Sequence, residues 1–288
     1  MAGFTLPSAT LLAQSILSGV FVGALYGLMG LGLSLSWGLL RQINLAHFAF
    51  AFLAAYACYQ LASMGMDPLA TLVILVPAFF ALGAALQALV ARFAITPFNS
   101  LLLTFGLTGI IEAIIQTIWT ADFRKLESSY SPLKFKVGAL FVPIPELITL
   151  VLAVGLSFAI WAVLRYTDLG KALRAAAEDG AIAAAFGVNQ RRNALLLAGT
   201  CSALASVAGV CLALSFTLAP SQIYAWIGVV FAAVMLGGLG RALGPLVAGS
   251  VIGVSEAVTM AVTAPSWAPI VSFTLLIVIL VLRPGRTA

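Results

Sequence analysis

The chain has 288 residues, of which 62% are hydrophobic and only 8% are charged. Soluble domains carry about 25% charged residues, so this composition excludes a water-soluble globular protein and indicates a polytopic membrane protein. The formal net charge is +5. The basic residues stand at the ends of apolar runs and form no basic face with interleaved aromatic residues, so we expect no nucleic-acid partner.

Apolar runs of membrane-crossing length follow one another along the whole chain. No basic residue precedes the first run, so we expect no cleaved signal peptide. A crossing helix needs roughly 20 apolar residues. The sequence therefore predicts one all-α transmembrane domain over residues 1–288, with eight or nine hydrophobic helices. The runs lie at 11–38, 44–64, 69–91, 98–120, 146–164, 194–217, 225–239, 244–262 and 266–282. An alternative is that one of the two runs beside Gly240–Leu243 is a short or re-entrant element.

The distribution of basic residues predicts the orientation. With nine crossings, the largest basic cluster, at 165–193, shares one side with Arg41, Arg92, Arg283 and Arg286. Because cytoplasmic loops are enriched in Lys and Arg, this side is expected to be the cytoplasm and the N-terminus to lie outside. The segment Asp122–Glu146 runs against the pattern, since its own basic residues fall on the outer side.

Small residues recur at a spacing of four in three of the runs. Helices in lipid associate largely through close backbone contact, which small residues permit. We expect a helix-packing role for Gly19, Gly23, Gly27, Gly209, Gly249 and Gly253. The stretches 32–56 and 231–258 share a weak pattern of apolar run, glycine turn, basic residue and apolar run, which is compatible with an inverted repeat.

The polar stretch 165–193 interrupts the hydrophobic sequence. It predicts a short helix capped by Asp168, a turn at Glu178–Gly180, and a second helix over Ala181–Phe186 that ends at a left-handed Gly187. The richness in helix formers favours a docking surface for a cytoplasmic partner over a plain connector. The residues expected to form this surface are Asp168, Gly170, Lys171, Arg174, Glu178, Asp179 and Gly187.

A few polar residues lie in or beside the apolar runs: Asn44, His47, Glu112, Gln116 and Glu256. Ionisable groups within a membrane usually face an interior cavity, so these residues are candidates for a translocation path, with helix–helix hydrogen bonding as the alternative. The pair Asn44 and His47 and the pair Glu112 and Gln116 have spacings that place each pair on one helix face. With a single histidine and no phosphate-loop, HExxH, CxxC or GxSxG pattern, we expect no metal, no cofactor and no enzymatic activity.

Four blocks, in the same order, resemble the permease subunits of branched-chain amino acid ABC importers. The length suits the shorter of the two permeases of such importers. The matching residues are INLAHFAF at 43–50; Thr167, Gly170, Arg174-Ala175, Asp179, Ala183 or Ala184, Gly187-Val188 and Ala208-Gly209; the glycine-rich 234–256; and LRPGR at 282–286. Two positions depart from the family pattern: Phe48 replaces a usual glycine, and Arg241 replaces a common serine.

The resemblance implies a multi-pass protein of the bacterial inner membrane, similar in fold to type II ABC importers. It also implies a second permease that is a paralogue of this chain, two cytoplasmic ATPase subunits that bind and hydrolyse ATP, and a periplasmic solute-binding protein. The stretch 165–193 would be the coupling loop. Two alternatives remain. One is a self-sufficient secondary carrier or channel, which would need paired carboxylates such as Glu112 and Glu256 to meet. The other is a permease for urea or short amides, which Phe48 suggests.

Overall fold

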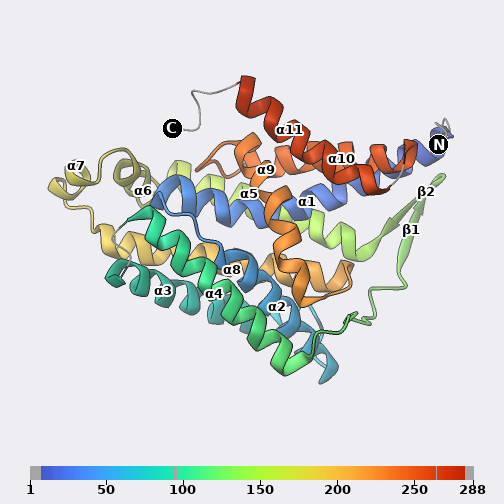
Figure 1. Ribbon diagram of the computed structural model, residues 1–288, viewed down its shortest axis with the longest axis horizontal. Helices are drawn as coiled ribbons and strands as arrows, with labels where there is room; N and C mark the ends of the chain where they lie inside the picture. The colour runs from blue at the N-terminus through green and yellow to red at the C-terminus, as the bar shows by residue number, and fades with distance from the viewer. Residues whose placement is uncertain (1–7, 94–95, 264, 283–288) are drawn as a thin grey trace.

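The computed structural model describes residues 8–93, 96–263 and 265–282, in which helices dominate (Figure 1). Arg283, Arg286 and most of the closing LRPGR block lie outside these ranges. The elements are α1 (Ala9–Leu40), α2 (Ala46–Ser63), α3 (Leu72–Phe93), α4 (Pro97–Trp119), β1 (Lys134–Val137), β2 (Leu140–Pro143), α5 (Ile144–Tyr166), α6 (Asp168–Glu178), α7 (Gly180–Ala185), α8 (Gln190–Ser215), α9 (Ile223–Gly237), α10 (Gly244–Val262) and α11 (Ala268–Leu282).

Each predicted apolar run coincides with an α-helix. In the part of the chain that the structure describes, seven helical segments are long and apolar enough to cross a membrane: those at α1, α3, α4, α5, α8, α9 and α10. The remaining two helices are borderline for physical reasons. Helix α11 has 15 residues, and α2 contains His47 and Gln60 among its 18 residues. The all-α polytopic fold is confirmed, and the number of full spans lies slightly below the prediction of eight or nine.

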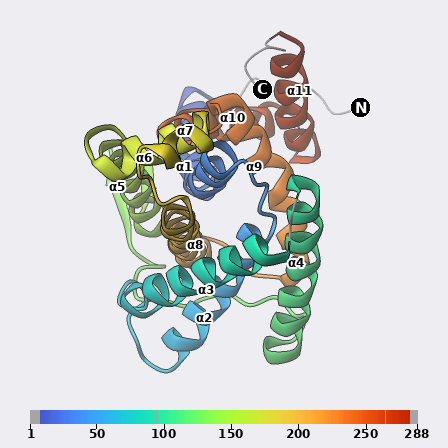
Figure 2. The same cartoon turned by 90° about the vertical axis from the view of Figure 1, so that its left-hand side faces the viewer.

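Helices α1 and α8 form the centre of the packing. They are the most buried of the candidate spans, and Figure 2 shows the other helices arranged around them. Helix α1 packs against α5, α8, α9 and α10, while α8 packs against α2 and α3. Bulky side chains of α2, including Phe48, Phe52 and Tyr56, fill the core next to these helices.

The most extensive contact between two helices is that of α1 with α10. A Cβ atom added to Gly19 would lie 2.6 Å from the Cα of Val254, and one added to Gly27 would lie 2.6 Å from the Cα of Leu246. Between them, a Cβ on Gly23 would overlap the backbone of Gly249. The spacing of four brings these glycines to one face of α1, so that the two backbones touch along about two turns.

The two ends of α1 mark the two ends of the molecule. At the end that carries the hairpin, Gln14 exchanges hydrogen bonds of 2.9 Å with the backbone of Phe141 in β2. At the opposite end, Arg41 donates a hydrogen bond of 2.8 Å to the carbonyl of Ala177 in α6. Figure 1 shows β1 and β2 at the right and α6 and α7 at the left. The polar stretch 165–193 and Arg41 therefore share one end of the helix bundle.

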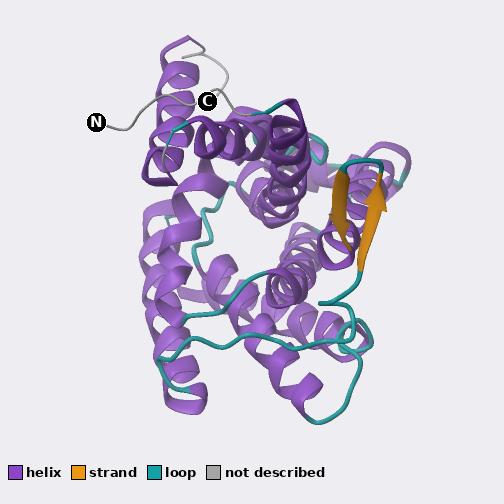
Figure 3. Cartoon of the chain, turned by 90° about the vertical axis from the view of Figure 1, so that its right-hand side faces the viewer, coloured by secondary structure: helices purple, strands orange, loops and turns teal. Residues whose placement is uncertain are grey.

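The hairpin is an element that the sequence analysis did not predict. Strands β1 and β2 pair antiparallel, with Val137 opposite Leu140 (Figure 3). Gly138, in the turn between them, has φ +63°, a backbone conformation that side chains disfavour. The hairpin sits directly before α5 and places the basic residues Lys134 and Lys136 at the end of the molecule opposite α6 and α7.

Candidate coupling surface and translocation path

The stretch 165–193 forms a helix–turn–helix, as predicted, with one correction at its start. The helix cap of α6 is Thr167, whose hydroxyl accepts a hydrogen bond of 3.1 Å from the Gly170 amide. Asp168 is the first helical residue and forms an ion pair of 3.0 Å with Lys171. The prediction of Asp168 as the cap was wrong because a threonine directly before it supplies the same oxygen one residue earlier.

Helix α7, the second helix of the helix–turn–helix, is bounded by a capping side chain at its start and by a left-handed glycine after its end. The side chain of Asp179 accepts a hydrogen bond of 3.0 Å from the Ile182 amide and so begins α7. Gly187 follows α7 with φ +87°, which agrees with a left-handed end. Asn189 then caps α8 through a 3.0 Å hydrogen bond to the Arg192 amide. The side chains of Thr167, Asp179 and Asn189 thus cap the starts of α6, α7 and α8.

Helix α6 is attached firmly to the bundle. Leu173 is buried in a cluster with leucines of α1 and α8, among them Leu35 and Leu197. Gly170 lies against the last turn of α5, where a Cβ would come within 2.5 Å of the Leu164 Cα. Helix α6 therefore contacts α1, α5 and α8 at once.

The outer surface of α6 and α7 combines charge with exposed apolar side chains. Lys171, Arg174, Glu178 and Asp179 are exposed. Phe186 is 86% exposed and Ile182 is 58% exposed. Neither apolar residue was predicted from the sequence, although their spacing of four in an alanine-rich segment was a usable signal. A bulky apolar pair among charges at the polar end of a membrane protein is typical of a protein-contact surface.

The polar residues of the first candidate pair do not share a helix face. Helix α2 begins at Ala46, so Asn44 lies in the turn before it and His47 lies on the helix. The His47 Nε2 atom is 2.9 Å from the Met29 carbonyl of α1, and the ring packs where a Cβ on Gly32 would be. His47 is thus buried between α1 and α2, which is the helix-packing alternative. The Asn44 side-chain oxygen is buried and has no hydrogen-bond partner among the described residues.

The second pair lies together on α4. Gln116 donates a hydrogen bond of 3.1 Å to the Glu112 carboxylate. Helix α4 is poorly covered by the other helices, and large apolar residues such as Phe105, Ile114 and Ile118 are exposed on it. A glutamate and a glutamine on a lipid-facing surface would be costly. This arrangement fits a surface that faces a water-filled path or another protein.

Glu256 belongs to a third, separate cluster. Its carboxylate accepts a hydrogen bond of 2.9 Å from the Tyr26 hydroxyl of α1 and another from the Ser272 hydroxyl of α11. It therefore joins three helices. Among the described residues, Glu112 and Glu256 have different hydrogen-bond partners and make no hydrogen bond to each other. Phe48 is also internal: it is fully buried and stacks on Phe231 at 6.3 Å.

Comparisons with known proteins agree with this architecture. The permease LivH of the high-affinity branched-chain amino acid transport system of Salmonella typhimurium is 29% identical over 94% of this chain and 93% of its own length. The corresponding permease BraD of Pseudomonas aeruginosa is 26% identical over 94% of both chains. A probable branched-chain amino acid permease of Methanocaldococcus jannaschii is 30% identical over 84% of this chain and 80% of its own. No solved structure matches the chain.

The family comparison extends over nearly the whole sequence. The family model described as "Branched-chain amino acid transport system / permease component" matches residues 15–280. This range runs from the first turns of α1 to the end of α11, and so includes the glycine contact between α1 and α10, the α6–α7 surface and the polar residues of α4. The chain belongs to the family of permease components of branched-chain amino acid transport systems, and it is a multi-pass membrane protein of an ABC transport system.

Proposed function

We propose that this chain is one of two permeases of an importer for branched-chain or related amino acids, and that its α6–α7 surface receives the movement of an ATPase subunit. The cargo follows from the names of the similar permeases. The partners we propose are a paralogous permease, two cytoplasmic ATPase subunits that hydrolyse ATP, and a periplasmic solute-binding protein. The chain itself provides the path and performs no chemical step.

One observation carries the coupling proposal: α6 is fixed to the bundle on its inner side and exposed on its outer side. Leu173 is buried among residues of α1 and α8, while Phe186 and Ile182 project from the same end of the molecule. An ATPase subunit that grips this outer surface would move α6 and α7 as a unit, because capping side chains fix their ends. The ends of α1, α5 and α8 would follow, and their tilting would open the path to alternate sides.

The exposed face of α4 supports the position of the path. Glu112 and Gln116 are hydrogen-bonded to each other on an otherwise apolar helix. Contact with lipid would leave this pair poorly solvated. We propose that the second permease covers α4 and that the two chains enclose the path, so that the pair meets water and the passing solute. Asn44 lies at the cytoplasmic approach to this wall, where the backbone beside it is hydrogen-bonded to Thr104 of α4.

The test compares two glycines that need the same backbone conformation at opposite ends of the molecule. Gly187 has φ +87° and Gly138 has φ +63°, and a Cβ on either would meet nothing within 4 Å. Proline cannot adopt a positive φ. We expect Gly187→Pro to abolish uptake and to reduce co-purification of the ATPase, while the chain remains in the membrane. We expect Gly138→Pro to retain both functions.

A second variant separates docking from local unfolding. Reversing the charge of Arg174, which caps neither helix, leaves the backbone path in place and changes the surface that the partner meets. Uptake at the wild-type level by both this variant and Gly187→Pro would refute the coupling role of α6 and α7. For the cargo, transport of radiolabelled leucine by the complete importer is the expected result, and transport of urea or a short amide without leucine would contradict it.

A further inference from the structure

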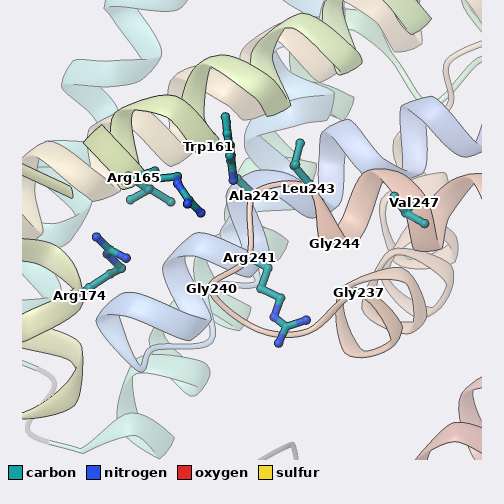
Figure 4. Close-up of a pocket in the computed structure, with 11 residues that line it drawn as sticks. Trp161, Arg165, Arg174, Gly237, Gly240, Arg241, Ala242, Leu243, Gly244 and Val247 are labelled. Atoms are coloured by element: carbon teal, nitrogen blue, oxygen red, sulfur yellow. The ribbon is translucent and has the colours of Figure 1, made fainter. Parts of the chain in front are cut away.

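A charged cavity lies at the α6 end of the molecule, between α5, α6 and the loop that joins α9 to α10 (Figure 4). Its volume is about 430 Å³. Three arginines from different elements line it: Arg165 from α5, Arg174 from α6 and Arg241 from the loop. Figure 4 shows Arg165 and Arg174 near each other on one side of the cavity, while the side chain of Arg241 extends from the loop in a different direction.

The positive charge of this cavity is not balanced by the residues around it. No carboxylate is among the residues that line it. Within residues 8–93, 96–263 and 265–282, the one ion pair is that between Lys171 and Asp168. The guanidinium group of Arg165 is held at the cavity by the rings of Trp161 and Tyr166, at 5.7 and 5.9 Å. Cations gathered in this way repel each other unless an anion lies among them.

An apolar groove continues from the cavity along α5 and α10. A second hollow of about 540 Å³ lies further along the same two helices, and Val247 lines both. Its walls include Leu150 and Val154 of α5 and Val251 and Val254 of α10. From Val247 to Val254 the helix advances about 10 Å. The cavity and the groove together therefore present a positive end at the membrane surface and an apolar channel that leads toward the middle of the bilayer.

We propose that this site binds an anionic glycerophospholipid from the cytoplasmic leaflet. Its phosphodiester group would lie among Arg165, Arg174 and Arg241, and one acyl chain would follow the groove between α5 and α10. A guanidinium group matches a phosphate because its planar N–H donors pair with two oxygens at once. Basic pockets beside membrane helices on the cytoplasmic side suit acidic headgroups, since that leaflet carries the anionic lipids. Because Arg241 departs from the common serine of the family, it makes this site a property of this chain rather than of all such permeases.

The site also suggests a consequence for the molecule. A bound lipid would join α5 and α6 to the α9–α10 loop, which otherwise meet here across an open cavity. It would thus stiffen the end of the bundle that carries the coupling surface. This inference does not depend on the proposed cargo or on the ATPase contact.

Native mass spectrometry of the full-length chain in detergent tests the proposal. Phosphatidylglycerol and phosphatidylcholine with identical acyl chains serve as the two lipids. We expect the chain to retain phosphatidylglycerol preferentially. Each basic residue near an acidic lipid contributes about 1 kcal/mol, so Arg165→Gln or Arg241→Gln is expected to weaken that binding about five-fold. Arg174 is left intact because it also lies on the proposed coupling surface. The control is Arg192→Gln, which removes one charge at the same end but outside the cavity.

Two further measurements distinguish an intact lipid from a free phosphate group as the bound anion. Val251→Trp is expected to fill the groove and weaken retention of the lipid, while the water-soluble headgroup glycerophosphoglycerol binds far more weakly than the lipid to every variant. Equal retention of the two lipids would overturn the proposal, as would binding of the soluble headgroup as tight as that of the lipid. The proposal would also fail if the arginine variants lost the ATPase subunit in pull-down experiments but kept phosphatidylglycerol, since the cluster would then be a protein-contact surface. Circular dichroism and a single elution peak establish that each variant is folded.

Discussion

Arg41, at the end of α1, donates a hydrogen bond of 2.8 Å to the carbonyl of Ala177 in α6. This contact joins the longest helix of the molecule to the proposed coupling surface. Arg41 also has φ +54°, so the chain turns sharply at this residue and directs its side chain away from the helix it has just left. The bond is made by the last turn of α6, on the opposite end from the Thr167 cap.

From this contact we predict that Arg41→Met reduces coupling. The variant keeps a long side chain but loses the donor, and a hydrogen bond from a charged group contributes about 1.5–3 kcal/mol when shielded and less at an exposed site such as this one. ATP hydrolysis by the reconstituted importer should become less dependent on the binding protein, and uptake should fall several-fold. The matched control is Arg92→Met, at the end of α3. An equal loss in both variants would mean that general charge, rather than the link to α6, is responsible.

A second prediction concerns the contact between α1 and α10. A Cβ on Gly23 would overlap the backbone of Gly249, and neither helix can move away without breaking the neighbouring contacts at Gly19 and Gly27. Overpacking a tight interface costs about 1–3 kcal/mol. We therefore expect Gly23→Ala to lower the thermal unfolding midpoint of the purified chain and its yield in the membrane.

The control for this substitution is Gly155→Ala in α5. Gly155 is also a mid-helix glycine, but nothing lies within 4 Å of its missing Cβ. Alanine is the better helix former by about 1 kcal/mol, so this variant should be as stable as the wild type or more so. A Gly23→Ala protein with an unchanged unfolding midpoint would contradict the close approach of the two helices.

The sequence predicted the helices well because each apolar run is long and uninterrupted, and a continuous run of about 20 apolar residues in lipid satisfies its backbone hydrogen bonds as a helix. It also predicted the two arms of α6 and α7, since Asp179 and Gly187 are strong local signals. It could not show which tertiary contacts form. His47 was a candidate path residue with helix packing as the alternative, and its ring lies against Gly32, a contact that no local pattern reveals. The β1–β2 hairpin was missed because its strands have only four residues each.

For the polar residues of the apolar helices, contacts within one helix were predictable from the sequence and contacts between helices were not. Spacing placed Glu112 and Gln116 on one helix face, and the structure shows them hydrogen-bonded. The partners of Glu256 come from α1 and α11, which lie far from it in sequence. Long-range pairing of this kind depends on the order in which helices pack, and a single sequence does not encode it in any local pattern. For this reason the cavity lined by Arg165 and Arg241 was also invisible before the fold was known.

Our third prediction is that Glu256 stabilises the packing of α1, α10 and α11. In Glu256→Leu the hydroxyls of Tyr26 and Ser272 lose their acceptor. Interhelical hydrogen bonds in membranes contribute about 0.6 kcal/mol each on average, so we expect a destabilisation of about 1 kcal/mol, whereas Glu256→Gln keeps an acceptor and changes little. Adding Tyr26→Phe to Glu256→Leu should cost almost nothing more, because the bond is already lost. Full additivity of the two substitutions, measured by thermal unfolding, would show that they do not interact.

The last prediction concerns pH and the loops at the hairpin end. The hydroxyl of Tyr130 donates a hydrogen bond of 2.7 Å to the Asp67 carboxylate and joins the α2–α3 turn to the segment that leads to β1. This bond lowers the pKa of Asp67 below its usual value and raises the pKa of Tyr130 above its own. Because the pKa of Asp67 is lowered in the folded state, the stabilisation is present above the pKa of the unfolded aspartate and is lost as the pH falls through the folded pKa.

For Tyr130 the sign is the reverse: its stabilisation is present below the pKa of the unfolded tyrosine and is lost as the pH rises through the raised pKa. The difference in thermal stability between the wild type and Tyr130→Phe should therefore be constant around neutral pH and disappear in both strong acid and strong alkali. Tyr166→Phe, which removes an exposed hydroxyl at the opposite end of the molecule, is the control and should show no such profile. A difference between wild type and Tyr130→Phe that persists unchanged into acid would mean that the phenol ring, and not its bond to Asp67, holds the two loops together.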